Sequence, residues 1–79
     1  MVKIRLSRRG SKNSPFYLIV VADSRSPRNG RFIEQIGFFN PFIKDISKKV
    51  YFNNDRIEYW RNKGAVMSKR VFSLINDVS

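Results

Sequence analysis

The spacing of apolar residues changes near residue 52, and this change limits the folds open to the chain. Before it, residues 2–6 alternate between apolar and polar side chains, and residues 16–22 form a continuous apolar segment rich in aromatic and β-branched residues. After it, apolar residues recur at helical spacing. The clearest helical stripe comprises Val71, Leu74, Ile75 and Val78. Strands followed by helices predict an α+β domain, with a small mixed or antiparallel sheet of about four strands and two C-terminal helices packed on it.

Four strands are expected in the first part of the chain. They are residues 2–6, 16–22, 32–39 and 50–52, with the second in the middle of the sheet and the last at its edge. The third strand has apolar residues at both odd and even positions, so we expect both of its faces to be partly covered. Residues 44–49 are expected to be a linker.

Two helices are expected beyond residue 52. Asn53 or Asn54 caps the first, which runs to about Lys63, turns Ile57 and Trp60 inward, and ends at Gly64 in a left-handed conformation. Ser68 caps the second helix, which carries the apolar stripe.

Length and residue types exclude many functional classes. With 79 residues, the chain has room for a single domain, residues 1–79. It has no cysteine and no histidine, which removes thiol nucleophiles, the commonest general base and the commonest transition-metal ligands. No apolar run approaches the ~20 residues of a membrane helix, and the N-terminus does not resemble a signal peptide. We predict a soluble intracellular protein that is not an enzyme, with no cofactor, no metal, no membrane and no small-molecule substrate.

The positive charge is concentrated in the first 31 residues. They hold eight basic residues and one acid, a net charge of +7 out of +10 for the whole chain. The eight are Lys3, Arg5, Arg8, Arg9, Lys12, Arg25, Arg28 and Arg31. A polyanion neutralises such a surface best, because each phosphate contacted releases condensed counterions. The distribution therefore predicts a nucleic-acid-binding surface made of these eight residues.

Two basic loops carry most of this charge. Residues 7–15 are rich in turn-forming residues, which predicts a mobile loop, and residues 24–31 contain Asn29 and Gly30, a pair typical of positive φ angles in a tight turn. Gly10 and Gly30 would let backbone amides approach phosphates closely, although a turn explains each glycine equally well. Six of the eight cations are arginines, which grip phosphate with two parallel hydrogen bonds.

The aromatic and acidic residues allow two further interpretations. Phe38, Phe39 and Tyr17 would stack on unpaired bases, or else belong to the core that so short a chain needs. A metal-dependent nuclease would need several converging carboxylates. We expect instead that Asp23 and Glu34 pair with Arg25 or Arg31 and shape the second loop.

Several segments in order resemble the bacterial-type small-subunit ribosomal protein S16 family. They include residues 1–6 with Arg8 and Gly10, then residues 15–17, 20–25, 28–34, 37–41 and 55–57, and finally Trp60, Gly64 and Ala65. The resemblance covers essentially the whole chain. It implies a small sheet with packed helices, and RNA contacts in the first strand and the two basic loops, which correspond to the eight cations above.

The resemblance also implies a role and partners. The role is a structural one in binding small-subunit ribosomal RNA and supporting subunit assembly, without catalysis. Its partners would be that RNA and neighbouring small-subunit ribosomal proteins, on the cytoplasmic ribosome of a bacterium or on an organellar ribosome. A free regulator that binds a short DNA or RNA site, and a metal-dependent nuclease acting through Asp23 or Glu34, are the alternatives.

Overall fold

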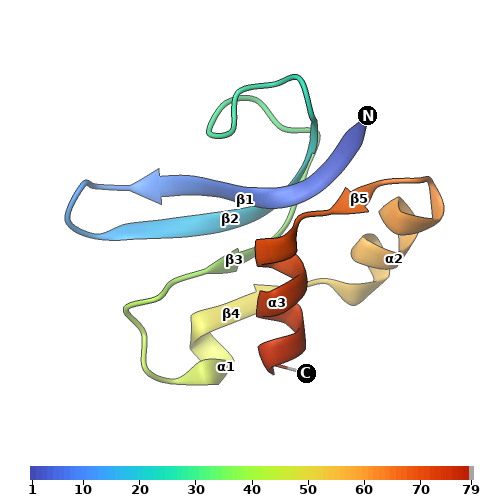
Figure 1. Ribbon diagram of the computed structural model, residues 1–79. Helices are drawn as coiled ribbons and strands as arrows, with labels where there is room; N and C mark the ends of the chain where they lie inside the picture. The colour runs from blue at the N-terminus through green and yellow to red at the C-terminus, as the bar shows by residue number, and fades with distance from the viewer. Residues whose placement is uncertain (79) are drawn as a thin grey trace.

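The protein forms a five-stranded sheet with helices packed against it (Figure 1). The computed structural model describes residues 1–78, apart from the side chains of residues 46, 47, 77 and 78. The strands are β1 (Val2–Gly10), β2 (Pro15–Asp23), β3 (Glu34–Phe39), β4 (Val50–Phe52) and β5 (Val66–Met67). The helices are α1 (Ile46–Lys49), α2 (Asn54–Asn62) and α3 (Lys69–Val78). No helix among these residues is long and apolar enough to cross a membrane.

The sheet is mixed and has the order β4-β3-β2-β1-β5. Neighbouring strands from β4 to β1 are antiparallel, and β5 runs parallel to β1. This confirms the α+β class, the central position of the second strand and the short edge strand at Val50–Phe52. Two elements were not expected: β5, and the single turn α1 within the supposed linker. Both are too short to carry a recognisable apolar pattern.

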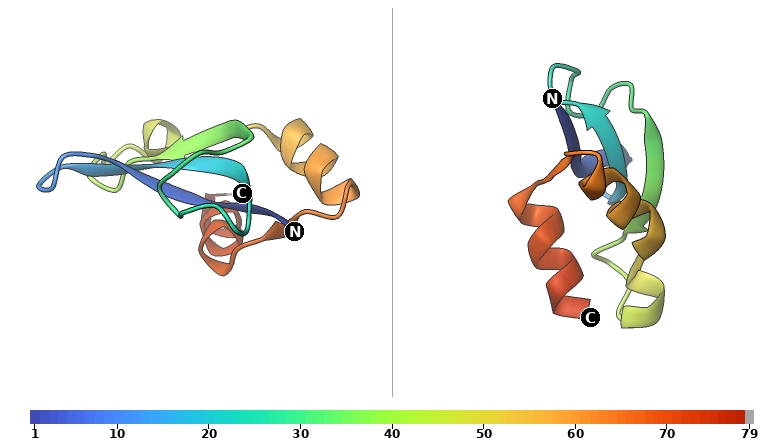
Figure 2. Two further views of the ribbon diagram at one scale, coloured as in Figure 1. Left: turned by 90° about the horizontal axis from the view of Figure 1, so that it is seen from above. Right: turned by 90° about the vertical axis from the view of Figure 1, so that its right-hand side faces the viewer.

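The first strand is longer than its alternating pattern predicts. Residues 7–10 continue β1, with Arg8 opposite Tyr17 and Gly10 opposite Pro15, so the prediction of a loop over residues 7–15 was wrong. Only residues 11–14 connect the two strands. The polar residues remain in the strand because β2 supplies their backbone hydrogen bonds, and this end of the hairpin projects from the body of the protein (Figure 2).

An irregularity in β3 explains its mixed apolar pattern. The pairing between β2 and β3 shifts at Ile19 and Val20, which lie opposite Gly37 and Gln35, so Ile36 is the extra residue of a β-bulge. The bulge exchanges the two faces of the strand, so apolar residues occur at both odd and even positions. The strand begins at Glu34 rather than at residue 32.

The core lies between the sheet and the two longer helices. Its buried residues are Ile4, Ile19, Val21, Ile36, Ile57 and Val71. Trp60 of α2 and Leu74 and Ile75 of α3 pack against this cluster, as the helical spacing predicted. The fourth member of the predicted stripe, Val78, lies outside the described side chains. Figure 1 shows α3 crossing in front of the sheet and α2 standing beside β5.

Both ends of α2 follow the predicted capping pattern. The side chain of Asn53 accepts hydrogen bonds from the backbone N–H groups of Asp55 and Arg56 at 3.0 and 3.3 Å. At the other end Gly64 has φ +94°. Gly64 N–H donates to Arg61 O and Ala65 N–H donates to Trp60 O, the two bonds of a Schellman motif. Local sequence therefore fixes the limits of this helix.

Candidate nucleic-acid interface

The second basic loop, residues 24–31, folds back onto β1. The Arg5 guanidinium donates to the backbone oxygens of Ser26 and Pro27 at 2.8 and 3.2 Å. The backbone N–H of Arg8 donates to Asn29 Oδ1 at 2.8 Å, and the Arg9 guanidinium donates to the Asn29 backbone oxygen at 3.1 Å. Residues of the first strand thus hold the loop in place, so part of the predicted phosphate-binding set has a structural role.

The turn in this loop differs from the predicted one. Gly30 N–H donates to Pro27 O at 3.0 Å, which places Arg28 and Asn29 at the centre of the turn and Gly30 at its end. Gly10 and Gly64 are the only described residues with positive φ, so the expectation of a positive-φ pair at Asn29 and Gly30 was wrong. A type I turn needs negative φ at both central positions and favours glycine at the fourth.

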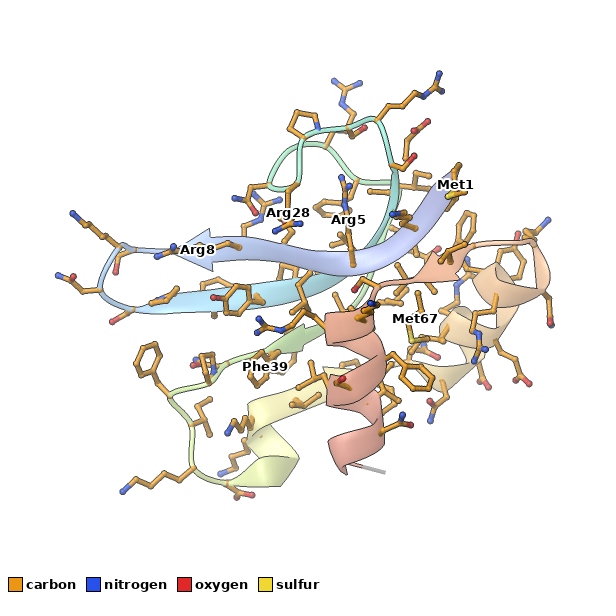
Figure 3. All side chains as sticks on the ribbon, in the orientation of Figure 1. Met1, Arg5, Arg8, Arg28, Phe39 and Met67 are labelled. Carbon is orange, nitrogen blue, oxygen red and sulfur yellow. The ribbon has the colours of Figure 1, made fainter. Side chains whose placement is uncertain are left out.

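A groove of about 440 Å³ runs along the outer edge of β1, between the loop and the start of α3. Its five cationic residues are Lys3, Arg5, Arg8, Arg28 and Arg70. Leu6, Tyr17, Asn29 and Ser68 complete the lining. Figure 3 shows Arg28 on the loop beside Arg5 and Arg8 of β1. No acidic residue lines the groove, so its electrostatic potential is positive along its length.

The structure divides the eight predicted residues into two groups. Lys3, Arg5, Arg8 and Arg28 line the groove. The other four lie outside it: Arg9, Lys12, Arg25 and Arg31. Within this second group the Arg9 guanidinium lies 5.9 Å from the centre of the Phe32 ring. Lys12 and Arg31 are exposed.

Sequence reasoning missed Arg70, which also lines the groove. Arg70 lies in the first turn of α3, which contains no acid. Basic residues are unfavourable near the positive end of a helix dipole, and this signal could have marked Arg70 as a candidate binding residue. The groove depends on β5, because Ser68 follows it directly and donates its N–H to Ile4 O at 2.9 Å. Because β5 was not predicted, the contribution of α3 to the groove could not be predicted either.

The remaining candidates were Gly10, Gly30 and Phe39. Gly10 has φ +84°, and a Cβ there would lie 2.6 Å from Ser14 O, so the tight hairpin already accounts for this glycine. Gly30 lies at the end of the turn described above. The Phe39 ring stacks on Tyr17 with centroids 6.0 Å apart, next to the groove. Phe38 instead stacks on Tyr51, on the opposite face of the sheet.

The two acids that flank the second loop, Asp23 and Glu34, have different partners. Asp23 pairs with Arg25 at 3.1 Å, as expected, and the hydrogen bonds from Arg25 hold the pKa of this carboxyl far below its usual range. Glu34 pairs with Arg56 of α2, not with Arg25 or Arg31, so that expectation was wrong. The Arg56 hydrogen bonds lower the pKa of Glu34. Among the described residues no three acidic side chains gather at one point that could hold a metal ion.

The Glu34–Arg56 pair joins β3 to α2 through two charge-assisted hydrogen bonds of 2.7 and 2.6 Å. Replacing Glu34 by glutamine should therefore lower the free energy of unfolding by about 1 kcal/mol at pH 7. Because the pKa of Glu34 is lowered on folding, its contribution is complete above the ordinary pKa of about 4.3 and disappears as the pH falls through the lowered value. Thermal unfolding of both proteins from pH 7 to pH 3 tests this.

A matched control for this experiment is Glu58→Gln on α2, because Glu58 is exposed and forms no ion pair among the described residues. The Glu58 variant should unfold like the unmodified protein at every pH. If Glu34→Gln and Glu58→Gln follow the same profile, the ion pair does not stabilise the fold.

Comparison with known proteins identifies relatives over nearly the whole chain. The family model described as Ribosomal protein S16 matches residues 8–68. The small ribosomal subunit protein bS16 of Wigglesworthia glossinidia brevipalpis is 57% identical over 76 residues, which cover 96% of this chain and 95% of the relative. The proteins of the same name from Blochmanniella floridana and Histophilus somni are 61% and 58% identical, covering 95% and 98% of this chain and 92% and 94% of theirs. This chain belongs to the ribosomal protein S16 family.

Proposed function

We propose that this protein is a structural component of the small subunit of a bacterial ribosome and binds small-subunit ribosomal RNA through the β1 groove. Its relatives are named as small ribosomal subunit proteins, and those compared above come from bacteria. The observation that carries the proposal is the set of five cations that line one groove without an acid. Phosphates are the groups best able to neutralise them.

The arrangement supports a role in holding RNA helices in a fixed relative position. The groove presents cations from β1, the loop and α3, while Lys12 extends from the hairpin tip and Arg31 from the end of the loop. Phosphates of separate RNA segments would bind these points at the same time. Such contacts recognise the shape of folded RNA rather than base sequence, because phosphate and sugar contacts carry no base identity.

Bound RNA would also stabilise the protein. Crowded cations repel one another in the free domain, so a ligand that neutralises them binds the folded state preferentially and shifts the equilibrium toward it. The helices stabilise the sheet, and the Glu34–Arg56 ion pair joins α2 to β3. The protein would thus support subunit assembly without catalysis, in contact with neighbouring small-subunit proteins.

A binding titration at two salt concentrations tests the proposal. The full chain is titrated with small-subunit ribosomal RNA and with a duplex DNA of equal charge. We expect a preference for the folded RNA that persists at the higher salt, and a slope of log affinity against log salt of roughly 4 to 7 if six to eight residues meet phosphates. Equal affinities that fall together would contradict shape-specific binding and favour a free nucleic-acid-binding regulator.

A further inference from the structure

The β1 groove is too small for an RNA duplex. Its volume of about 440 Å³ is typical of small-molecule sites, and a paired helix is far wider. A duplex could rest its phosphates on the rim, whereas a single nucleotide is small enough to enter. Since the proposed ligand is RNA, an entering nucleotide must first be unpaired, and unpaired nucleotides are the ones whose bases are free to stack on side chains.

The groove contains an aromatic surface for a base. Tyr17 lines the groove together with Leu6, and its ring is held in place by stacking on Phe39, with an angle of 22° between the rings. Lys49 Nζ in turn lies 6.0 Å from the centre of the Phe39 ring. Because the ring is already fixed, a base can stack on it without a further loss of side-chain conformational entropy.

The walls of the groove provide cations that are free to bind the flanking phosphates. Arg28 lines the groove from the loop and Arg70 from the first turn of α3, and neither side chain makes a hydrogen bond or an ion pair with other described residues. Arg5 differs, because its guanidinium is already bound to the loop carbonyls. Two unengaged cations from different elements and one aromatic ring in the same groove provide the groups that a base and its two flanking phosphates require.

The groove also contains donors for a base edge. Asn29 Oδ1 accepts the Arg8 N–H, which orients the amide and leaves its NH₂ group free to donate. Ser68 Oγ accepts the Val71 N–H at 3.3 Å, which leaves the hydroxyl proton available. Both residues line the groove.

We infer that the β1 groove binds one unpaired nucleotide of the RNA, with its base against Tyr17 and its flanking phosphates on Arg28 and Arg70. This rests on the proposed RNA-binding function and names the RNA element that the groove takes. The phosphate contacts outside the groove then hold the paired regions on either side of that nucleotide.

Two short RNA duplexes of the same sequence test the inference. One carries a single bulged 2-aminopurine, and the other has the same base opposite a partner. The full chain should bind the bulged duplex about tenfold more tightly, and 2-aminopurine fluorescence should fall on binding because its base stacks. Tyr17→Leu, which keeps an apolar side chain on the sheet, should lose both effects and retain its affinity for the paired duplex.

Tyr51→Leu is the matched control, because Tyr51 also stacks on a phenylalanine but lies on the opposite face. It should behave like the unmodified protein, and Tyr17→Phe should keep the preference. The inference fails if the unmodified protein does not distinguish the two duplexes, or if Tyr17→Leu remains folded and still prefers the bulge. If ribosomal RNA is nevertheless bound in preference to DNA, the proposed function stands without this inference; equal binding of ribosomal RNA and DNA removes both.

Discussion

Replacing Gly37 by alanine should destabilise the protein by about 3 kcal/mol and lower its Tm by more than about 10 °C. Gly37 is buried in β3, directly opposite Phe52 of β4. A Cβ at this position would collide with the Tyr51 carbonyl oxygen and lie 2.9 Å from Phe52 Cα. These are backbone atoms that cannot rotate away, so the pairing of β3 with β4 must open.

The consequence is large because β4 has only three residues and borders the core through Val50 and Phe52. Small domains have little stability to lose. Denaturant unfolding followed by circular dichroism measures the effect. Gly64→Ala is the matched control. Gly64 has positive φ but no atom within 4 Å of the added Cβ, so this substitution should lower the free energy of unfolding by about 1 kcal/mol. Equal costs at the two positions would show that the close approach at Gly37 is unimportant.

Removing Arg28 and Arg70 together should weaken binding to small-subunit ribosomal RNA by about 10- to 100-fold and leave the fold unchanged. The slope of log affinity against log salt should also fall by about 1 for each arginine that binds a phosphate. Neither side chain supports the structure through a described hydrogen bond or ion pair, so the double alanine variant should unfold no more easily than the unmodified protein. Titrations at several salt concentrations, with thermal unfolding of the same samples, test this.

The matched control removes the same charge outside the groove. Lys44 and Arg61 are both exposed, absent from the groove lining and outside the proposed phosphate-binding set. Their double alanine variant should lose less than about threefold in affinity, because general attraction is screened over about 10 Å at ordinary salt. An equal reduction of affinity in the two double variants would mean that the affinity for RNA depends only on the net charge of the protein. A folding defect in the Arg28 and Arg70 variant would assign these side chains to the structure instead.

Much of the fold is encoded in local patterns. The alternation at residues 2–6 predicted the first strand, and the continuous apolar segment predicted the central one, because periodicity reports directly which faces are buried. The limits of α2 were predictable because Asn53 and Gly64 act on backbone groups only a few residues away. The pairing of Asp23 with Arg25 is similarly local.

The errors concern contacts between distant segments. Nothing in the sequence near Glu34 identifies Arg56 as its partner, since the two meet only when α2 packs against the sheet. The extension of β1 to Gly10 depends on the length of β2. The bulge at Ile36 arises from the pairing register between β2 and β3, and the sequence of β3 alone does not determine that register.

The α+β class, the caps of α2 and the excess of positive charge in the first 31 residues all follow from the chain alone, because spacing, capping and charge are properties of neighbouring residues. The choice of the cations that form the groove follows only from folding. Folding brings Arg70 to β1 through the parallel pairing of β5, and it turns Arg5 and Arg9 toward the carbonyl groups of the loop. A binding surface depends on long-range packing, which places residues 28 and 70 on the same groove although no local pattern connects them.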